Sequence, residues 1–128
     1  MTRLFVYGTL KRGCKNHRHL SGQRYLADVR TTPGYRLYSL GDYPGLVPAT
    51  GDTAGITGEL WEVDDAALAR LDAFEGVDEG LYRREPVHLA TPSIATADQP
   101  VFTYIYARDL TGRSPLGDTW TEPDSGVH

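Results

Sequence analysis

The chain has 128 residues, a net charge of -4 and a composition that is 40% hydrophobic and 23% charged, as expected of a globular protein with one core. No run of Lys or Arg exceeds two residues, so a nucleic-acid partner is not expected, because a phosphate backbone requires a dense positive surface. No stretch approaches the roughly 20 apolar residues of a membrane helix, and the N-terminus lacks a signal-peptide pattern, so we expect a cytoplasmic protein outside the membrane.

Six segments have the β-branched and aromatic composition of strands. They are residues 3–7, 23–29, 35–40, 56–63, 82–89 and 101–106. Residues 41–55, rich in Gly and Pro, predict a structured loop. In the segment that follows, Leu60 and its alternate neighbours face one side and Glu59 and Trp61 the other. That period is typical of a strand buried on one face.

Residues 64–75 predict the main helix. Asp64 is a good N-cap, because its carboxylate can accept hydrogen bonds from the free amides of the first turn. Gly76 stands where a glycine would end the helix in a left-handed conformation. A shorter helix is expected around residues 16–20.

The order of these elements predicts an α+β fold. Strands and helices do not alternate regularly, which favours an antiparallel or mixed sheet, closed as a barrel or open, with helices packed against it. We expect residues 1–120 to form a single domain and residues 90–100 to form an exposed loop. Residues 121–128 are polar and without periodicity, and we expect a flexible tail.

Glu75 occupies an unexpected place on the predicted helix. Successive helical residues are about 100° apart, so the apolar stripe of Leu68, Leu71 and Phe74 also includes position 75. A carboxylate there should point toward the core or a cavity. Burial without a partner costs several kcal/mol, roughly, or keeps the carboxyl protonated, and proteins often retain such groups for function.

Two structural alternatives to a functional Glu75 remain open from the residues alone. The carboxylate could pair with Arg83 or Arg84, which are close in sequence. It could also turn out to solvent, because it is the last helical residue.

The second candidate site is the turn after the first strand. A strand that runs into Gly8 and then a helix start at Thr9 leaves several backbone amides without partners, and such amides favour an anion. One glycine is a weak signal, and read alone it favours a plain turn. Cys14 is the only cysteine, which excludes an internal disulfide and a thiolate metal cluster. We interpret it as a passive small apolar residue. His17 and His19 lack a third metal ligand and are interpreted as solvated.

Several motifs resemble the γ-glutamylcyclotransferase-like (AIG2-like) superfamily, most nearly its γ-glutamylamine branch and compact bacterial members. The Tyr-Gly-Thr-Leu turn and the Leu-Asp-Ala-Phe-Glu-Gly segment are the most specific, and the resemblance runs from about residue 4 to residue 120. The matching segments are residues 5–13, Asn16-His17, residues 37–48, residues 58–63, residues 71–76, residues 81–84 and residues 117–120.

The resemblance implies a small mixed β-barrel with flanking helices and a cavity between the first turn and the helix end. It assigns Glu75 as the catalytic acid/base. The residues it assigns to substrate binding are Tyr7, Gly8, Thr9 and Leu10, and candidate cavity-lining residues are Tyr43, Tyr82 and Arg84.

The reaction implied by the resemblance is intramolecular. The α-amine of a γ-glutamyl compound attacks its own γ-carbonyl, which yields 5-oxoproline and a free amine, with no metal, nucleotide or redox cofactor. The only expected partner is the small-molecule substrate. Two alternatives are a non-catalytic module that binds a small carboxylate or γ-glutamyl ligand, and a thiol enzyme that uses Cys14.

Overall fold

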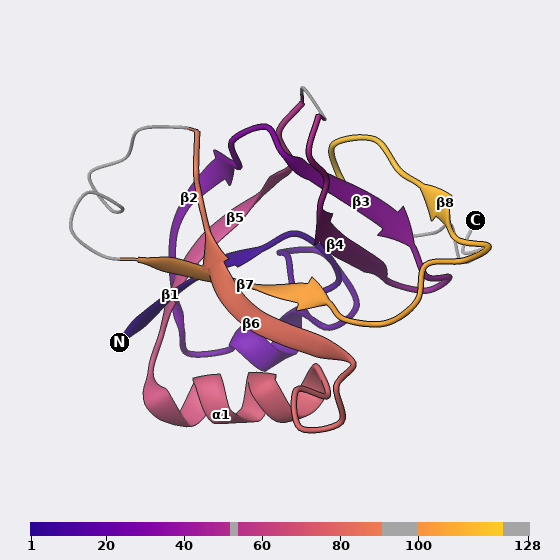
Figure 1. Cartoon of the computed structure of the whole chain (residues 1–128). Coiled ribbons are helices and arrows are strands. Elements are labelled where there is room, and N and C mark those ends of the chain that lie inside the picture. The colour runs from indigo at the N-terminus through magenta and orange to yellow at the C-terminus, as the bar shows by residue number, and fades with distance from the viewer. Residues whose placement is uncertain (52–53, 91–99, 122–128) are drawn as a thin grey trace, which may run out of the picture.

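A curled, mixed eight-stranded sheet forms the body of the computed structural model, which describes residues 1–51, 54–90 and 100–121 (Figure 1). The strand order is β2-β5-β1-β7-β4-β3-β8, and β6 pairs with β7. The β1–β7 and β7–β4 pairs are parallel and the others antiparallel. The strands are β1 (Thr2–Val6), β2 (Arg24–Arg30), β3 (Tyr35–Ser39), β4 (Pro44–Pro48), β5 (Thr57–Val63), β6 (Tyr82–Val87), β7 (Val101–Tyr106) and β8 (Ser114–Pro115).

Two edges of the sheet meet beyond the ends of β2 and β6. Thr31 and Leu89 form an antiparallel bridge, and the Ala90 amide donates to the Arg30 carbonyl at 2.8 Å. Strands β2, β5, β1, β7 and β6 therefore form a small barrel, and β4, β3 and β8 extend from it. The predicted α+β fold with a mixed barrel and flanking helices is confirmed.

The prediction of a loop over residues 41–55 is wrong in part, because β4 lies within it and pairs antiparallel with β3. Its composition suits a close contact: a Cβ on Gly45 would lie 2.9 Å from the Cβ of Tyr106. The Leu46 amide is bonded by a side chain, since it donates to the Tyr7 hydroxyl at 3.2 Å. Strands are predicted from their β-branched and aromatic composition, which this segment lacks. The side-chain contacts that hold it in the sheet cannot be seen in its own sequence.

Strand β5 was predicted to be buried on one face, and it is buried on both. Leu60 packs in one apolar cluster, while Trp61 packs in the other. Glu59, beside Trp61 on that second face, is only 7% exposed. The second face is covered because the chain after β1 folds back over it.

The main helix, α1 (Asp65–Phe74), begins and ends as predicted. The Asp64 carboxylate accepts from the Ala67 amide at 2.7 Å. Gly76 has φ +68, and the hydrogen bonds from the Gly76 and Val77 amides back into the last turn complete a glycine C-cap.

A short 3₁₀ helix, η1 (His17–Leu20), contacts α1. Figure 1 shows the two helices side by side along one side of the sheet. The structure therefore has helices on the face that carries Trp61 and Glu59.

Two predictions fall mainly outside the described residues. The expected loop of residues 90–100 includes 91–99, and the expected tail of residues 121–128 includes 122–128, which the structure does not describe. Among the described residues, no helix combines the length and apolarity that a membrane span requires.

Candidate active site

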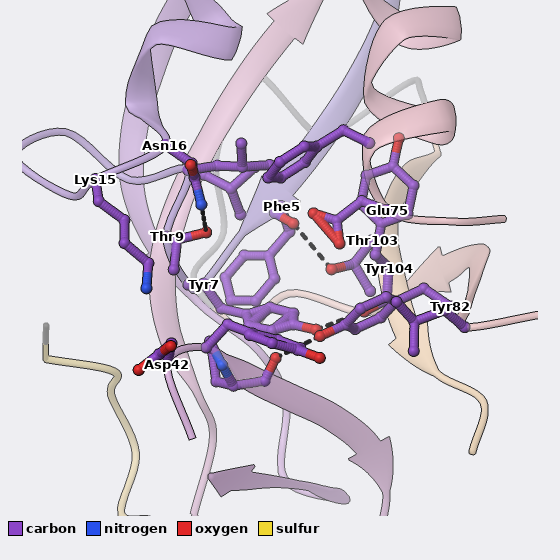
Figure 2. A pocket seen from close by; sticks show the side chains of 17 residues that line it. Phe5, Tyr7, Thr9, Lys15, Asn16, Asp42, Glu75, Tyr82, Thr103 and Tyr104 are labelled. Atoms are coloured by element: carbon purple, nitrogen blue, oxygen red, sulfur yellow. Dashed lines mark hydrogen bonds between the residues drawn. The ribbon is translucent and has the colours of Figure 1, made fainter. Parts of the chain in front are cut away.

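A cavity of about 420 Å³ opens where β1 and β4 diverge along the same edge of β7. Leu4 of β1 pairs with Phe102 near the start of β7, whereas Leu46 of β4 pairs with Ile105 near its end. The chain leaves the sheet between these points, and the end of α1 lies across the gap (Figure 2). The lining residues are Phe5, Val6, Tyr7, Gly8, Thr9, Leu10, Lys15, Asn16, Asp42, Tyr43, Pro44, Phe74, Glu75, Leu81, Tyr82, Thr103 and Tyr104.

Glu75, predicted as the acid/base, lines this cavity at the C-cap of α1. Its amide donates to the Leu71 carbonyl at 2.8 Å, and the glycine C-cap after it holds the chain in place. Figure 2 shows the half-buried carboxylate pointing into the cavity, on the side opposite Thr9. Burial raises the pKa of Glu75 from 4.5 to about 7, because a low-polarity surrounding disfavours the charged form.

Neither structural alternative for Glu75 is met. Arg83 pairs with Glu85 at 2.7 Å, and Arg84 pairs with Asp72 at 2.9 Å. Within the described residues, no arginine or lysine forms an ion pair with Glu75. The carboxyl is neither neutralised by a cation nor turned out to bulk water.

Arg84, a candidate lining residue, lies outside the cavity lining. Its Nε and Nη2 donate to the two oxygens of Asp72, and the Tyr104 hydroxyl donates to Asp72 Oδ1 at 2.7 Å. The sequence could not show this, since Asp72 and Tyr104 meet only through the packing of α1 on β7. Arg84 thus orients Asp72, which accepts the hydrogen bond from Tyr104, a residue of the cavity wall.

The predicted substrate-binding turn forms the facing wall, with Tyr7, Gly8, Thr9 and Leu10 all in the lining. Of the two alternatives for this segment, a helix start and a plain turn, the structure has the turn. The Lys11 amide donates to the Gly8 carbonyl at 3.1 Å, which closes a turn. The turn therefore does not present a helix N-terminus to this site.

Contacts on both sides hold the turn. A Cβ on Gly8 would lie 2.7 Å from Cγ of Pro44, so only glycine allows β4 to approach. The Asn16 amide donates to the Thr9 carbonyl at 3.0 Å, and Asn16 Nδ2 donates to Thr9 Oγ1 at 3.0 Å. In the described part of the chain, the amides of residues 8–10 have no hydrogen-bond acceptor. They remain available to an anion in the cavity.

Tyrosine hydroxyls are bonded to the main chain at the cavity wall. The Tyr7 hydroxyl donates to the Tyr104 carbonyl at 2.7 Å and accepts from Leu46. The Tyr82 hydroxyl donates to the Pro44 carbonyl at 2.7 Å. Burial raises the pKa of Tyr7 and of Tyr82 far above the ordinary range. Both stay neutral near pH 7, so among these groups only Glu75 exchanges a proton there.

Other lining residues lie toward the rim or were not predicted. Tyr43, a candidate lining residue, is 38% exposed. Lys15 and Asp42 line the cavity on the side of Thr9 (Figure 2). Thr103 is fully buried and donates to the Phe5 carbonyl at 2.9 Å. Thr103 is the one residue of β7 that is neither aliphatic nor aromatic, and this was the only sequence signal for it.

The histidines are not solvated as expected. His17 Nδ1 lies 2.9 Å from the Leu10 carbonyl oxygen, which can only accept, so Nδ1 carries a hydrogen. The His17 ring packs 5.3 Å from that of Trp61. The His19 ring lies 4.2 Å from that of Phe74.

The described residues contain no group of three His, Cys, Asp or Glu side chains that could hold a metal ion. Cys14 is not among the residues that line the cavity.

Comparison with known proteins identifies the family. The family model described as "Gamma-glutamyl cyclotransferase, AIG2-like" matches residues 4–122. The chain is 36% identical over 124 residues to the γ-glutamylcyclotransferase family protein YtfP of Escherichia coli K12, covering 95% of this chain and 98% of the relative. It is 38% identical over 91 residues to the γ-glutamylaminecyclotransferase of Rattus norvegicus, covering 66% and 60%.

A solved structure agrees with the sequence match. The crystal structure of a mouse AIG2-like protein superimposes with a TM-score of 0.79 at 27% identity, covering 98% of this chain and 92% of that chain. The model match spans the turn at Gly8 and the helix end at Glu75 together with the barrel between them. On this evidence, the chain belongs to the AIG2-like γ-glutamyl cyclotransferase family.

Proposed function

We propose that the protein is an enzyme that converts a γ-glutamyl compound to 5-oxoproline and a free amine. The observation that carries this proposal is the placement of the Glu75 carboxyl, with its pKa near 7, in one cavity with the free amides of residues 8–10. The related rat protein is named as a γ-glutamylaminecyclotransferase, which supports this reaction class.

The reaction requires one bond to form and one to break. The α-amine nitrogen of the glutamyl group attacks the γ-carbonyl carbon and closes a five-membered ring. The bond from that carbon to the departing nitrogen then breaks. Because attacking and attacked groups belong to one molecule, an enzyme gains mainly by holding the chain in its productive rotamer.

Glu75 supplies the proton transfers. In its ionised form it accepts a proton from the α-ammonium, and in its protonated form it gives that proton to the departing nitrogen. The ring nitrogen then loses its second proton to the carboxylate, which passes it to the released amine. A carboxyl with pKa about 7 suits both steps near neutral pH, because each form is substantially populated. The neutral hydroxyls of Tyr7 and Tyr82 are bonded to carbonyl groups and leave this role to Glu75.

The turn supplies recognition of the part that all γ-glutamyl compounds share. The substrate's α-carboxylate lies on the amides of residues 8–10, which are good donors to a carboxylate. This orientation directs the α-amine and the γ-carbonyl toward Glu75. The departing amine then extends toward the rim, where Asp42 and Tyr43 line the cavity.

The test is to incubate the protein with a panel of γ-glutamyl amines and γ-glutamyl peptides and to measure 5-oxoproline by mass spectrometry. Glu75→Gln keeps the size of the side chain but removes the acid/base. We expect its kcat to fall by about 10²- to 10⁴-fold. The matched control is Glu79→Gln, an exposed residue of the following turn, which should keep wild-type activity.

The outcomes distinguish the enzyme from a binding module. If Glu75→Gln retains activity within a few-fold of wild type, the proposed mechanism is wrong. If calorimetry detects binding of a γ-glutamyl amine that is recovered intact after prolonged incubation, the protein is a non-catalytic module. Unchanged activity in Cys14→Ala removes the thiol alternative.

A further inference from the structure

Glu59 is a second buried carboxylate, and it lies outside the cavity lining. It occupies the middle of β5, is 7% exposed, and is paired across the sheet with Val6 of β1. A carboxylate this deep requires hydrogen-bond partners to offset the loss of water. Its partners connect it to the turn.

Three donors converge on Glu59. Its Oε1 accepts from the Arg12 amide at 3.1 Å and from Trp61 Nε1 at 3.0 Å. Its Oε2 accepts from Arg12 Nε at 3.0 Å. The Arg12 guanidinium is in turn packed 3.9 Å from the centre of the Tyr25 ring and paired with Asp28 at 3.0 Å. Arg12 is thereby held by its main chain and by its side chain.

Both ends of the substrate-binding turn are attached to this one residue. The turn begins after Val6, whose backbone is in register with Glu59. It ends at Arg12, whose amide is bound by the Glu59 carboxylate. The segment of residues 7–11, which presents the free amides, is thus a short loop closed at its base by Glu59.

We infer that Glu59 is a positioning residue that holds the amides of residues 8–10 in the arrangement that binds the substrate's carboxylate. This inference rests on the proposed function for its kinetic consequence, though not for its structural one. A loop that is already ordered loses less conformational freedom when a ligand binds. The carboxylate does not change during ring closure, so the turn binds ground state and transition state alike, and loosening it raises KM more than it lowers kcat.

The kinetic test compares two glutamates of the same strand. Glu59→Gln places an amide nitrogen among donors and breaks at least one of the three bonds. Glu62→Gln is the matched control, because the ion pair that Glu62 forms among the described residues is with Arg3 of β1, at 3.8 Å, and not with the turn. With the γ-glutamyl substrate that wild type turns over fastest, we expect Glu59→Gln to raise KM about tenfold with kcat within about threefold, and Glu62→Gln to change neither.

A second measurement does not depend on activity. Backbone order parameters of residues 8–10, from ¹⁵N relaxation, should lie near 0.85 in wild type and fall toward 0.6 in Glu59→Gln, while those of β1 and β7 stay unchanged. If Glu59→Gln does not fold, Arg12→Ala replaces it, since the Arg12 side chain is about half exposed and its loss removes one of the bonds. We then expect a smaller change in the same direction.

The outcomes separate this inference from the proposed function. A chain that makes no 5-oxoproline from any substrate contradicts the proposed function, while the order parameters still test the role of Glu59. Unchanged order at residues 8–10, or a loss of order spread evenly over the sheet, overturns the inference. A fall in kcat with KM unchanged overturns it as well.

Discussion

At the scale of single residues, the Glu75 carboxyl titrates near neutral pH, whereas the buried hydroxyls of Tyr7 and Tyr82 in the same cavity wall stay neutral there. Glu75 lacks an ion-pair partner within the described residues, and its pKa of about 7 measures what burial costs the charged form. Asp72, one turn earlier on α1, is in contrast paired with Arg84 and bonded by Tyr104. Asp72 and Glu75 therefore differ in whether an ion-pair partner balances the carboxylate.

The raised pKa of Glu75 predicts how the free energy of unfolding depends on pH. The folded-state pKa of Glu75 is raised from 4.5 to about 7, so the folded state retains a proton that the unfolded state has lost between these values. The free energy of unfolding should therefore fall as pH rises from 4.5 to 7, by about 3 kcal/mol from this residue. Urea unfolding at pH 5 and pH 8 measures it.

Glu75→Gln removes this dependence. We expect the variant to be more stable than wild type at pH 8, and close to wild type at pH 5. Glu79→Gln should keep the wild-type dependence, because Glu79 is exposed. Equal slopes for wild type and Glu75→Gln would show that the carboxyl is not buried.

At the scale of elements, the end of α1 decides where Glu75 points. The chain reverses at Gly76, whose φ of +68 costs a residue with a Cβ about 1–2 kcal/mol. The reversal also packs closely, because a Cβ on Gly76 would lie 3.1 Å from the Cβ of Leu81. The helix cap and the cavity wall are thus one structural unit.

Gly76→Ala should therefore affect both stability and catalysis. Gly80→Ala is the matched control: Gly80 has φ +74, but no atom lies within 4 Å of an added Cβ. Both variants should lose about 1 kcal/mol or more in urea unfolding. Only Gly76→Ala should also lower kcat, because it displaces Glu75. Equal kinetics for the two variants would mean that the close contact with Leu81 does not position the carboxylate.

At the scale of the whole molecule, residues 118–120 connect distant parts of the barrel. Trp120 is 5% exposed and packs in the cluster of the barrel interior. Its carbonyl accepts from Lys11 Nζ at 2.8 Å, at the end of the turn of residues 7–11. Asp118 pairs with Arg30 of β2 at 2.8 Å. This segment therefore supports the barrel and the cavity together.

Trp120→Ala should lower the free energy of unfolding by about 3–5 kcal/mol, as for other large core truncations. Trp120→Phe keeps most of the apolar contact and should lose clearly less. Urea unfolding of both variants measures the difference. A loss below about 1 kcal/mol in Trp120→Ala would show that the segment is dispensable.

Features that depend on near neighbours along the chain could be predicted from the amino-acid sequence. The cap at Asp64 and the stop at Gly76 follow from the residue types at the two helix ends, and the structure has both. Helical spacing puts Glu75 on the stripe of Leu68, Leu71 and Phe74; Leu71 is buried and Glu75 lines the cavity, whereas Phe74, at the helix end, is 41% exposed. Most strands were found in the same way, because alternating and β-branched segments are local patterns. The resemblance to the family was carried by two such local motifs.

Features that depend on which distant segments meet could not be predicted from the amino-acid sequence, because they arise from the packing of the folded chain. Strand β4 is held by the hydroxyls of Tyr7 and Tyr82, which its own composition does not reveal. Arg84 pairs with Asp72 instead of lining the cavity, and Glu59 is buried because the turn folds over it. Burial, pairing and cavity formation arise between segments far apart in sequence. Spacing rules apply only to residues that lie within a few positions of one another along the chain.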